Sequence, residues 1–226
     1  MREHRMDWDR QRRNGTAEAV LCPGKSDRQI AAILAEAAGG GRRLLLTRLS
    51  PERFATLPRV EGLDYEPVGQ TAILGTVPRP RPGIGIVAAG TSDIPYATEA
   101  ARTLAFHGFA APIVADVGVA GLWRLMDEID SLRAHRILIA VAGMEGALFS
   151  VLTGLVAAPV IAVPTPVGYG VARDGRLALD AALGSCAAGL TVVNIGNGFG
   201  AACAAIRMMT AVESLAPVVA ELDAIS

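Results

Sequence analysis

Apolar runs alternate with longer stretches of helical spacing along the second part of the chain. The apolar runs occupy residues 84–89, 112–115, 137–142, 160–163 and 190–194, and the helical stretches occupy residues 95–106, 121–132, 145–156, 177–183 and 199–215. Strands that alternate with helices predict right-handed crossovers and a parallel sheet that is covered on both faces. We therefore expect an α/β fold, a three-layer doubly wound parallel sheet, over residues 83–226.

The first part of the chain has a different pattern. Residues 1 to about 25 are polar and rich in arginine, and we expect them to be irregular. Ser26 suits the N-cap of a helix whose apolar stripe is Ile30, Ile33 and Leu34, and residues 42–47 suit a short strand. Prolines at every second position over residues 78–82 predict an extended linker. A smaller N-terminal α+β segment is therefore expected over residues 1–82.

Charge is distributed unevenly between these two parts. The chain has 226 residues and a formal net charge of −1, but residues 1–82 hold 14 basic against 10 acidic residues, whereas residues 83–226 hold 7 against 12. All basic residues but Lys25 are arginines, whose planar forks match phosphate and carboxylate groups. The overall net charge of −1 gives no indication of nucleic-acid binding. A solvated surface of mixed charge is also enough to explain any single arginine.

Cysteines and apolar stretches bear on the cellular compartment. The three cysteines are scattered and form no Cys-x-x-Cys motif, and the N-terminus lacks the apolar segment of a signal peptide. The uncharged stretches at 146–172 and 181–206 are interrupted by prolines or by asparagines and glycines, so we expect no membrane span. A reducing, cytoplasmic location fits these features.

The strongest single motif is the end of the first apolar run. There the sequence Gly90-Thr91-Ser92-Asp93 follows the strand and precedes a helix. Backbone N–H groups and two hydroxyls at a helix N-terminus form a typical anion site, and phosphate suits it well. The Gly-Lys-Ser/Thr of a Walker loop does not follow, so the motif indicates a phosphate cradle without naming the protein class.

Further candidate residues follow the other strands, because parallel sheets bind ligands at the carboxyl ends of their strands. Glu145 stands at the expected opening of a helix, where a carboxylate also simply complements the helix dipole. Cys186 lies in a small-residue segment of the last crossover, which the 190–194 strand follows. Inert packing is the default for cysteine, but a thiol near arginines and helix N-termini becomes a nucleophile. His4, His107 and His135 are the only histidines and none follows a strand, so carboxylates and a thiol would have to carry any chemistry.

Taken in order, these motifs resemble the LarB family. The resemblance rests on Ala-Ala-Gly-Thr-Ser-Asp (88–93), Asp-Val-Gly-Val-Ala-Gly-Leu (116–122), Val-Ala-Gly-Met-Glu-Gly-Ala-Leu (141–148), Ile-Ala-Val-Pro-Thr (161–165), Val-Gly-Tyr-Gly (167–170), Ser-Cys-Ala (185–187), Val-Val-Asn-Ile (192–195) and Asn-Gly-Phe-Gly (197–200). The leader region is similar too, with Asp-Trp-Asp-Arg-Gln-Arg-Arg-Asn-Gly (7–15), Gly-Lys-Ser (24–26) and Leu-Thr-Arg-Leu (46–49). The set covers nearly the whole chain.

The resemblance implies an enzyme of nickel-pincer cofactor biosynthesis with a PurE-like catalytic domain, expected to assemble as a homo-octamer. Such an enzyme carboxylates the pyridinium ring of nicotinic acid adenine dinucleotide at C5 and hydrolyses the phosphoanhydride, with carbon dioxide or bicarbonate as co-substrate, and releases AMP. Cys186 would be the nucleophile and Glu145 its acidic partner, at strand ends neighbouring the 90–93 turn. The substrate-binding residues would be Gly90, Thr91, Ser92, Asp93, Asp116, Gly118, Gly143, Met144, Gly146, Pro164, Gly168, Tyr169 and Asn197.

Two features qualify this expectation. Mg²⁺ is inferred for the hydrolytic step from phosphoryl chemistry, but the sequence offers no clear ligand set. Three residues depart from the family pattern: Gly196 where aspartate is expected, Trp123 where histidine is frequent, and Pro166 where serine is usual. The departures affect substrate detail more than reaction class.

Two alternatives remain open at this point. A PurE-type aminoimidazole ribonucleotide carboxylase or mutase would need a histidine after the third strand, where this chain has Ala147, Leu148 and Phe149. A non-catalytic nucleotide-binding module would keep the phosphate cradle but would have no need of a thiol in the pocket.

Overall fold

Five strands from the second part of the chain form one parallel sheet. In the computed structural model, which describes residues 3–223 (side chains only as far as residue 214), these strands are β5 (Ile84–Ala88), β6 (Ile113–Val114), β7 (Ile137–Ala142), β8 (Val160–Pro164) and β9 (Leu190–Val192). They lie in the order β6-β5-β7-β8-β9, and every pairing between neighbours is parallel. The chain adds β6 on one side of β5 and then β7, β8 and β9 on the other side. The strand order therefore reverses between β5 and β7, which is the kind of switch point where ligands bind in open α/β sheets.

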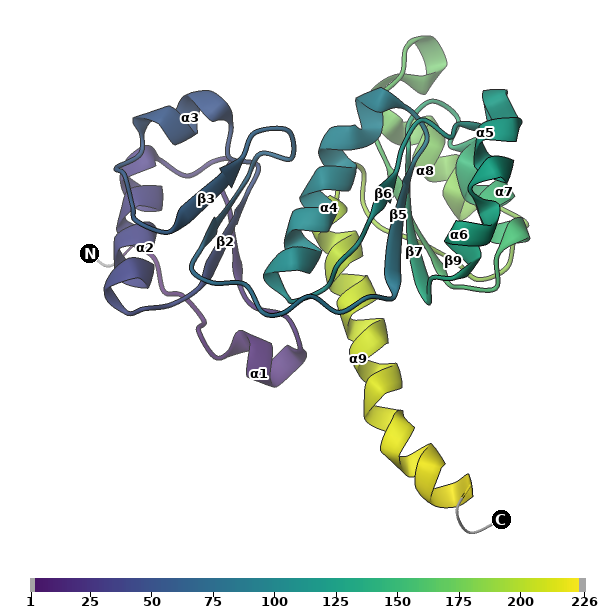
Figure 1. The fold of residues 1–226 in the computed structure, drawn as a ribbon. Helices are drawn as coiled ribbons and strands as arrows, with labels where there is room; N and C mark the ends of the chain where they lie inside the picture. Colours follow the sequence, from purple (N-terminus) through teal and green to yellow (C-terminus); the bar gives the residue numbers. More distant parts are fainter. Residues whose placement is uncertain (1–2, 224–226) are drawn as a thin grey trace.

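Helices cover both faces of this sheet, as Figure 1 shows. On one face, α4 (Ile94–Phe106) and α9 (Gly198–Asp223) pack against side chains such as Ile86, Ile139 and Ile161. On the other face lie α5 (Leu122–Asp127), α6 (Ile129–Arg133), α7 (Ala147–Leu155) and α8 (Arg176–Leu183), which pack against Leu138 and Ala140 among others. All residues of β5, β7 and β8 are buried, as expected for a parallel sheet between two helical layers. The predicted α/β, doubly wound architecture is confirmed.

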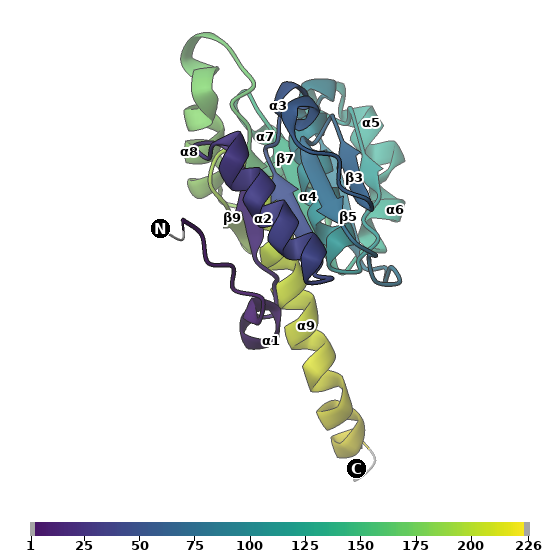
Figure 2. The same ribbon diagram turned by 90° about the vertical axis from the view of Figure 1, so that its left-hand side faces the viewer.

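The N-terminal part forms a smaller mixed sheet. Its strands β1 (Ala19–Leu21), β2 (Leu44–Thr47), β3 (Leu63–Glu66) and β4 (Thr71–Leu74) lie in the order β1-β2-β4-β3, with only the β1–β2 pair parallel. Helix α2 (Asp27–Gly39) covers its outer face, which is toward the viewer in Figure 2, while Leu45 and Ile73 on the other face contact Phe106 of α4. The short helices α1 (Arg10–Asn14) and α3 (Pro51–Thr56) complete this part. Helix α4 is therefore packed between the two sheets.

Several sequence expectations need correction here. Residues 1–25 are not wholly irregular, because α1 and β1 lie within them. The helix expected over 121–132 is divided into α5 and α6 at Glu128, and the helix expected from Glu145 begins only at Ala147. Helix α9 continues past the expected end at residue 215 and projects beyond the rest of the chain (Figures 1 and 2).

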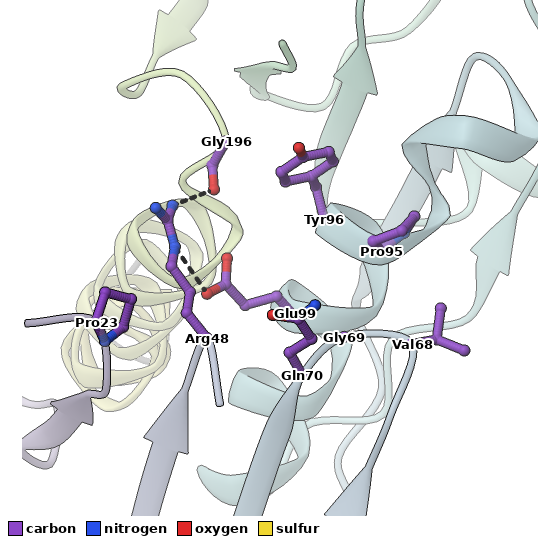
Figure 3. Close-up of a pocket in the computed structure, with 9 residues that line it drawn as sticks. All are labelled: Pro23, Arg48, Val68, Gly69, Gln70, Pro95, Tyr96, Glu99 and Gly196. Carbon is purple, nitrogen blue, oxygen red and sulfur yellow. Dashed lines mark hydrogen bonds and ion pairs between the residues drawn. The ribbon is translucent and has the colours of Figure 1, made fainter. Parts of the chain in front are cut away.

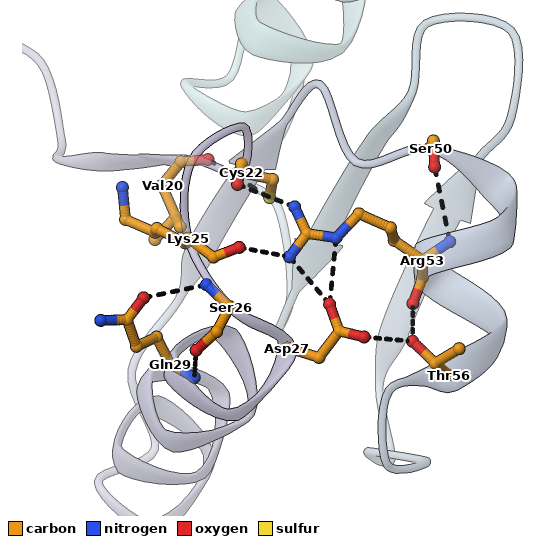
Figure 4. Close-up of polar contacts among 9 residues, drawn as sticks. All are labelled: Val20, Cys22, Lys25, Ser26, Asp27, Gln29, Ser50, Arg53 and Thr56. Atoms are coloured by element: carbon orange, nitrogen blue, oxygen red, sulfur yellow. Dashed lines mark hydrogen bonds and ion pairs between the residues drawn. The ribbon is translucent and has the colours of Figure 1, made fainter.

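The Gly-Lys-Ser segment at residues 24–26 forms a helix cap. Ser26 Oγ accepts a hydrogen bond from Gln29 N at 3.2 Å, and the Gln29 side chain in turn accepts one from Ser26 N, which makes the capping box of α2. The Arg53 guanidinium donates to Cys22 O at 2.9 Å and Lys25 O at 2.6 Å, as Figure 4 shows. The Arg53 contacts join the chain that precedes α2 to α3. The capping box confirms the prediction that Ser26 is an N-cap.

The linker carries no regular element from Gly75 to Pro82, as the prolines predict, yet it is held in place. Arg81 N donates to Gly108 O at 3.0 Å, and Ala110 N donates to Arg81 O at 2.8 Å. The division at residue 82 stays a prediction; residues 1–2 and 224–226 of the two expected extents lie outside the described residues.

Candidate functional site

A cavity of about 410 Å³ lies at the carboxyl ends of β5, β6 and β7, over the switch point of the sheet. We call it the strand-end cavity. It is lined by residues 89–93, Asp116, 118–120, 142–145, 147–148 and Val167. Its size falls within the range of small-molecule sites, and its place follows the rule for doubly wound sheets.

The 90–93 turn forms one wall, and Asp93 anchors it. Asp93 is 4% exposed; its carboxylate accepts hydrogen bonds from Thr165 Oγ1 at 2.7 Å and from Gly90 N at 3.0 Å. Burial raises the pKa of Asp93 above its ordinary value, whereas the hydrogen bonds from Thr165 and the backbone oppose that rise. The carboxylate therefore holds the turn against β8, while the neighbouring Thr91 and Ser92 remain exposed at the cavity.

Glu145 and Met144 form the opposite rim of the cavity. Both are exposed, and Met144 has a φ of 51°, a left-handed conformation that few residues with a side chain adopt. Glu145 lies in the turn between β7 and α7, two residues before the helix begins, and not at the first position of the helix as expected. An interaction with the helix dipole is therefore a weaker explanation of this glutamate than the sequence suggested. It is free to face a ligand in the cavity.

Gly143 and Gly118 bring backbone segments unusually close together below this rim. A Cβ atom at Gly143 would lie 2.2 Å from Val167 O, and one at Gly118 would lie 2.9 Å from Ala89 O. Both positions therefore require glycine for close approach of neighbouring strand-end loops.

Asp116 lies on the third side of the cavity, with a φ of 59°. Its carboxylate forms an ion pair with Arg124 Nη1 on α5. Sequence reasoning missed Arg124, although its spacing of eight residues from Asp116 across a turn and the start of a helix is compatible with such a pair. The apolar lining residues were also missed; they flank the strand-end motifs and carry no chemical signal of their own.

Nine of the predicted site residues thus line one cavity, and the others lie elsewhere. The nine are Gly90, Thr91, Ser92, Asp93, Asp116, Gly118, Gly143, Met144 and Glu145. Gly146 is buried in the turn before α7 with a φ of 63°, and Pro164 ends β8. Gly168 and the 77% exposed Tyr169 lie in the loop after β8, and Asn197 caps α9 by accepting a hydrogen bond from Gly200 N at 2.8 Å.

Cys186 differs most from its expected position. It lies between α8 and β9, before the strand rather than after it, so it does not share the strand ends with Glu145. The neighbouring Ser185 hydroxyl is 2.7 Å from the Ser150 hydroxyl of α7, which fixes the segment against that helix. Cys186 is nevertheless the exposed cysteine, whereas burial raises the pKa of both Cys22 and Cys203 to about 11. Its thiol is accessible, but it does not line the cavity of its own chain.

The described residues offer no group of three or more histidine, cysteine, aspartate or glutamate side chains placed to hold a metal ion. Mg²⁺ often binds through only one or two carboxylates together with substrate phosphates, so the carboxylates of the cavity do not contradict its presence beside a pyrophosphate. Within the same part of the chain, no helix combines the length and apolar character needed to cross a membrane.

The residues that depart from the family pattern do not line the cavity. Trp123 is 67% exposed on α5, and Pro166 is exposed in the loop after β8. Gly196 is buried and follows β9, where it meets Arg48 of the N-terminal part.

Comparison with known proteins agrees with this architecture. Residues 1–76 match the family described as LarB/PurE-like N-terminal domain, and residues 83–222 match the family described as AIR carboxylase. An uncharacterised protein of Methanocaldococcus jannaschii is 48% identical over 120 residues, which is 52% of this chain and 46% of that protein, so the match spans about half the length of the curated relative. The two family matches, in this order, support a carboxylase-type function. The chain belongs to the LarB family and carries a PurE-like catalytic domain.

Proposed function

We propose that this protein carboxylates the pyridinium ring of nicotinic acid adenine dinucleotide at C5 and hydrolyses its phosphoanhydride, the first step of nickel-pincer cofactor synthesis. The observation that carries the proposal is the grouping of the 90–93 turn and Glu145 around one cavity at the switch point of a PurE-like sheet. The turn suits a ribose phosphate, and the exposed carboxylate suits a proton acceptor opposite it.

The chemistry requires a nucleophile because an electron-poor pyridinium ring does not attack carbon dioxide. Addition of the Cys186 thiolate at C4 converts the ring to a dihydropyridine, whose C5 behaves as an enamine carbon. C5 then forms a bond to carbon dioxide, Glu145 removes the C5 proton, and the thiolate leaves as aromaticity returns. In the hydrolytic half, water adds to phosphorus and the P–O–P bond breaks, which gives AMP and the biscarboxylated mononucleotide.

Because Cys186 lies outside its own chain's strand-end cavity, we propose that the catalytic unit is a homo-oligomer, expected to be an octamer. In it the exposed 184–189 loop of one copy would approach the cavity of another. The exposure of Cys186 and of the nearby Leu183, which is 66% exposed, supports this arrangement, because an exposed apolar side chain next to the loop suits burial against a second copy.

Incubation with nicotinic acid adenine dinucleotide, bicarbonate and Mg²⁺, followed by mass spectrometry, tests the reaction. We expect two products, AMP and a mononucleotide that carries one carboxyl group more than the mononucleotide half of the substrate. We expect neither product with Cys186→Ala. Cys203→Ala is the matched control and should retain activity, because Cys203 is half-buried on α9 and does not line the strand-end cavity, and burial raises the pKa of its thiol. Absence of both products with the wild-type protein would disprove the proposal.

Mixing inactive variants tests the shared site. Co-expressed Glu145→Gln and Cys186→Ala subunits would regain activity if the two residues of one site come from different copies. If both came from a single chain, every mixed site would lack one of them and no activity would return.

The match to the AIR carboxylase family makes aminoimidazole ribonucleotide a second candidate substrate. None of the cavity's lining residues is a histidine, the residue that this chemistry would need there. The same assay with aminoimidazole ribonucleotide as substrate distinguishes the two reactions.

A further inference from the structure

A second hollow lies where the N-terminal sheet meets the catalytic part, and Figure 3 shows its lining. We call it the junction pocket. It has a volume of about 330 Å³ and is lined by Pro23, Arg48, residues 68–70, 95–96, Glu99 and Gly196. Its walls therefore come from the N-terminal sheet, from α4 and from the loop after β9, and its size is that of a small-molecule site.

Arg48 is the cation of this pocket, and its neighbours fix its orientation. Its Nη2 donates to Gly196 O at 2.6 Å, and its Nε lies 3.7 Å from Glu99 Oε1. The Glu99 side chain is only 5% exposed and also accepts a hydrogen bond from Phe199 N at 3.3 Å. Because the Arg48 side chain is 45% exposed, its remaining N–H groups are available to an anionic ligand.

Tyr96 supplies an aromatic wall beside this cation. No hydrogen bond joins its hydroxyl to another residue within the described part of the chain, so the group is available as a donor or acceptor. Gly196 keeps the space between Tyr96 and Arg48 open, since a Cβ there would lie 3.1 Å from the Tyr96 ring and 3.7 Å from Arg48 Nη2. A ring surface, a phenol and a guanidinium together complement a heterocycle that carries a phosphate.

The junction pocket and the strand-end cavity are lined by neighbouring residues of one segment. Residues 90–93 line the cavity and residues 95–96 line the pocket, with the exposed Thr91 and Ser92 at the segment's start. An extended ligand that occupied both hollows would follow this segment from one hollow to the other. Nicotinic acid adenine dinucleotide has such a form, with a ring system at each end and a pyrophosphate between.

We propose that the junction pocket binds the adenosine monophosphate half of the dinucleotide, with Arg48 on its phosphate and Tyr96 beside its base. This inference rests on the function proposed above. It assigns a substrate contact to one of the N-terminal arginines and makes the N-terminal part a portion of the substrate site.

Direct binding of AMP to the full chain, measured by calorimetry, tests the inference. Arg48→Lys keeps a positive charge beside Glu99 but loses the planar fork, and we expect it to weaken AMP binding roughly 10- to 100-fold, as for a lost charge-assisted hydrogen bond. Tyr96→Phe should weaken it severalfold. The matched control is Arg102→Lys, because Arg102 on α4 pairs with Asp64 of the N-terminal sheet across the same junction without lining the pocket. This variant should bind AMP as the wild type does.

Each outcome bears on one proposal or the other. Unchanged AMP binding in both Arg48→Lys and Tyr96→Phe, or an equal loss in Arg102→Lys, would overturn the pocket assignment, even if the protein carboxylates the dinucleotide. Arg48-dependent AMP binding in a protein that fails to carboxylate the dinucleotide would retain AMP binding in the pocket and refute the proposed reaction.

Discussion

Replacement of Thr165 by valine tests whether the buried Asp93 carboxylate anchors the strand-end cavity. Thr165 is fully buried, and its hydroxyl donates to Asp93 Oδ1 at 2.7 Å. Valine has nearly the same shape, so the change removes the hydrogen bond without opening a large cavity. A hydrogen bond to a charged group contributes about 1.5–3 kcal/mol, and we expect the free energy of unfolding at pH 8 to fall by about that amount.

The same change has a pH dependence of known sign. Burial raises the pKa of Asp93 above its ordinary value of 3.8, and the Thr165 hydroxyl opposes that rise. Loss of the hydroxyl therefore raises the pKa further, so the variant gains more stability than the wild type as the pH falls toward the folded-state pKa. The difference in unfolding free energy between the two proteins should be largest at pH 8 and smaller at pH 5.

Guanidinium chloride unfolding at the two pH values, followed by circular dichroism, measures this difference. The control is Thr103→Val, which also removes a fully buried hydroxyl. That hydroxyl donates to an uncharged acceptor, the backbone carbonyl oxygen of Glu99, at 2.8 Å. We expect it to cost about 0.5–1.5 kcal/mol with no change attributable to Asp93. Equal losses in both variants, or a Thr165→Val loss that does not shrink on acidification, would refute the anchoring role.

Two further predictions concern glycine and histidine. Gly143→Ala should destabilise the protein by about 1–3 kcal/mol in the same unfolding assay because its Cβ would meet a backbone oxygen at 2.2 Å. The control is Gly154→Ala on α7, where a Cβ meets nothing within 4 Å, and this variant should be more stable than the wild type by about 0.5 kcal/mol. A Gly143→Ala variant that is more stable than Gly154→Ala would contradict the close-approach argument. Burial lowers the pKa of His107, whose ring nitrogens form hydrogen bonds with Ala17 N at 3.0 Å and Thr103 O at 2.8 Å. The wild type should therefore lose stability relative to His107→Gln as the pH falls from 7 to 5, through the ordinary histidine pKa of 6.5. If the unfolding free energies of the two proteins change in parallel with pH, this effect is excluded.

The catalytic sheet could be predicted closely because its strands are continuously apolar. Strand β7 has the predicted bounds, and β5 and β8 differ by one residue at one end. Strands that are buried on both faces of a sheet carry apolar residues at nearly every position, so the apolar run itself marks them in the sequence. By contrast, the strands β3 and β4 went unpredicted, because four residues give too few positions for periodicity to distinguish a strand from a loop. Strand β2 is equally short, but its run of three leucines, Leu44 to Leu46, marked it as a strand.

The candidate site was predictable where it follows strands and was not where it depends on the return of the chain. Strand ends meet at one edge of a parallel sheet, so the pattern of apolar runs is enough to group the residues from Gly90 to Glu145. Cys186 follows a helix that runs back along the sheet. The end of that helix at residue 183 was predicted, but sequence order does not show how far the following loop lies from the strand-end cavity. The contact of Arg48 with Gly196 joins residues 148 positions apart and left no local pattern.

Backbone strain in this protein is concentrated beside its two hollows. Of the five described non-glycine residues with positive φ, Arg48 and Gln70 line the junction pocket, while Asp116 and Met144 line the strand-end cavity. Each such residue costs about 1–3 kcal/mol that the surrounding fold must offset. Selection for heat resistance alone would therefore favour glycine or asparagine at these four positions, and the resulting proteins would trade a fixed site geometry for a higher melting temperature.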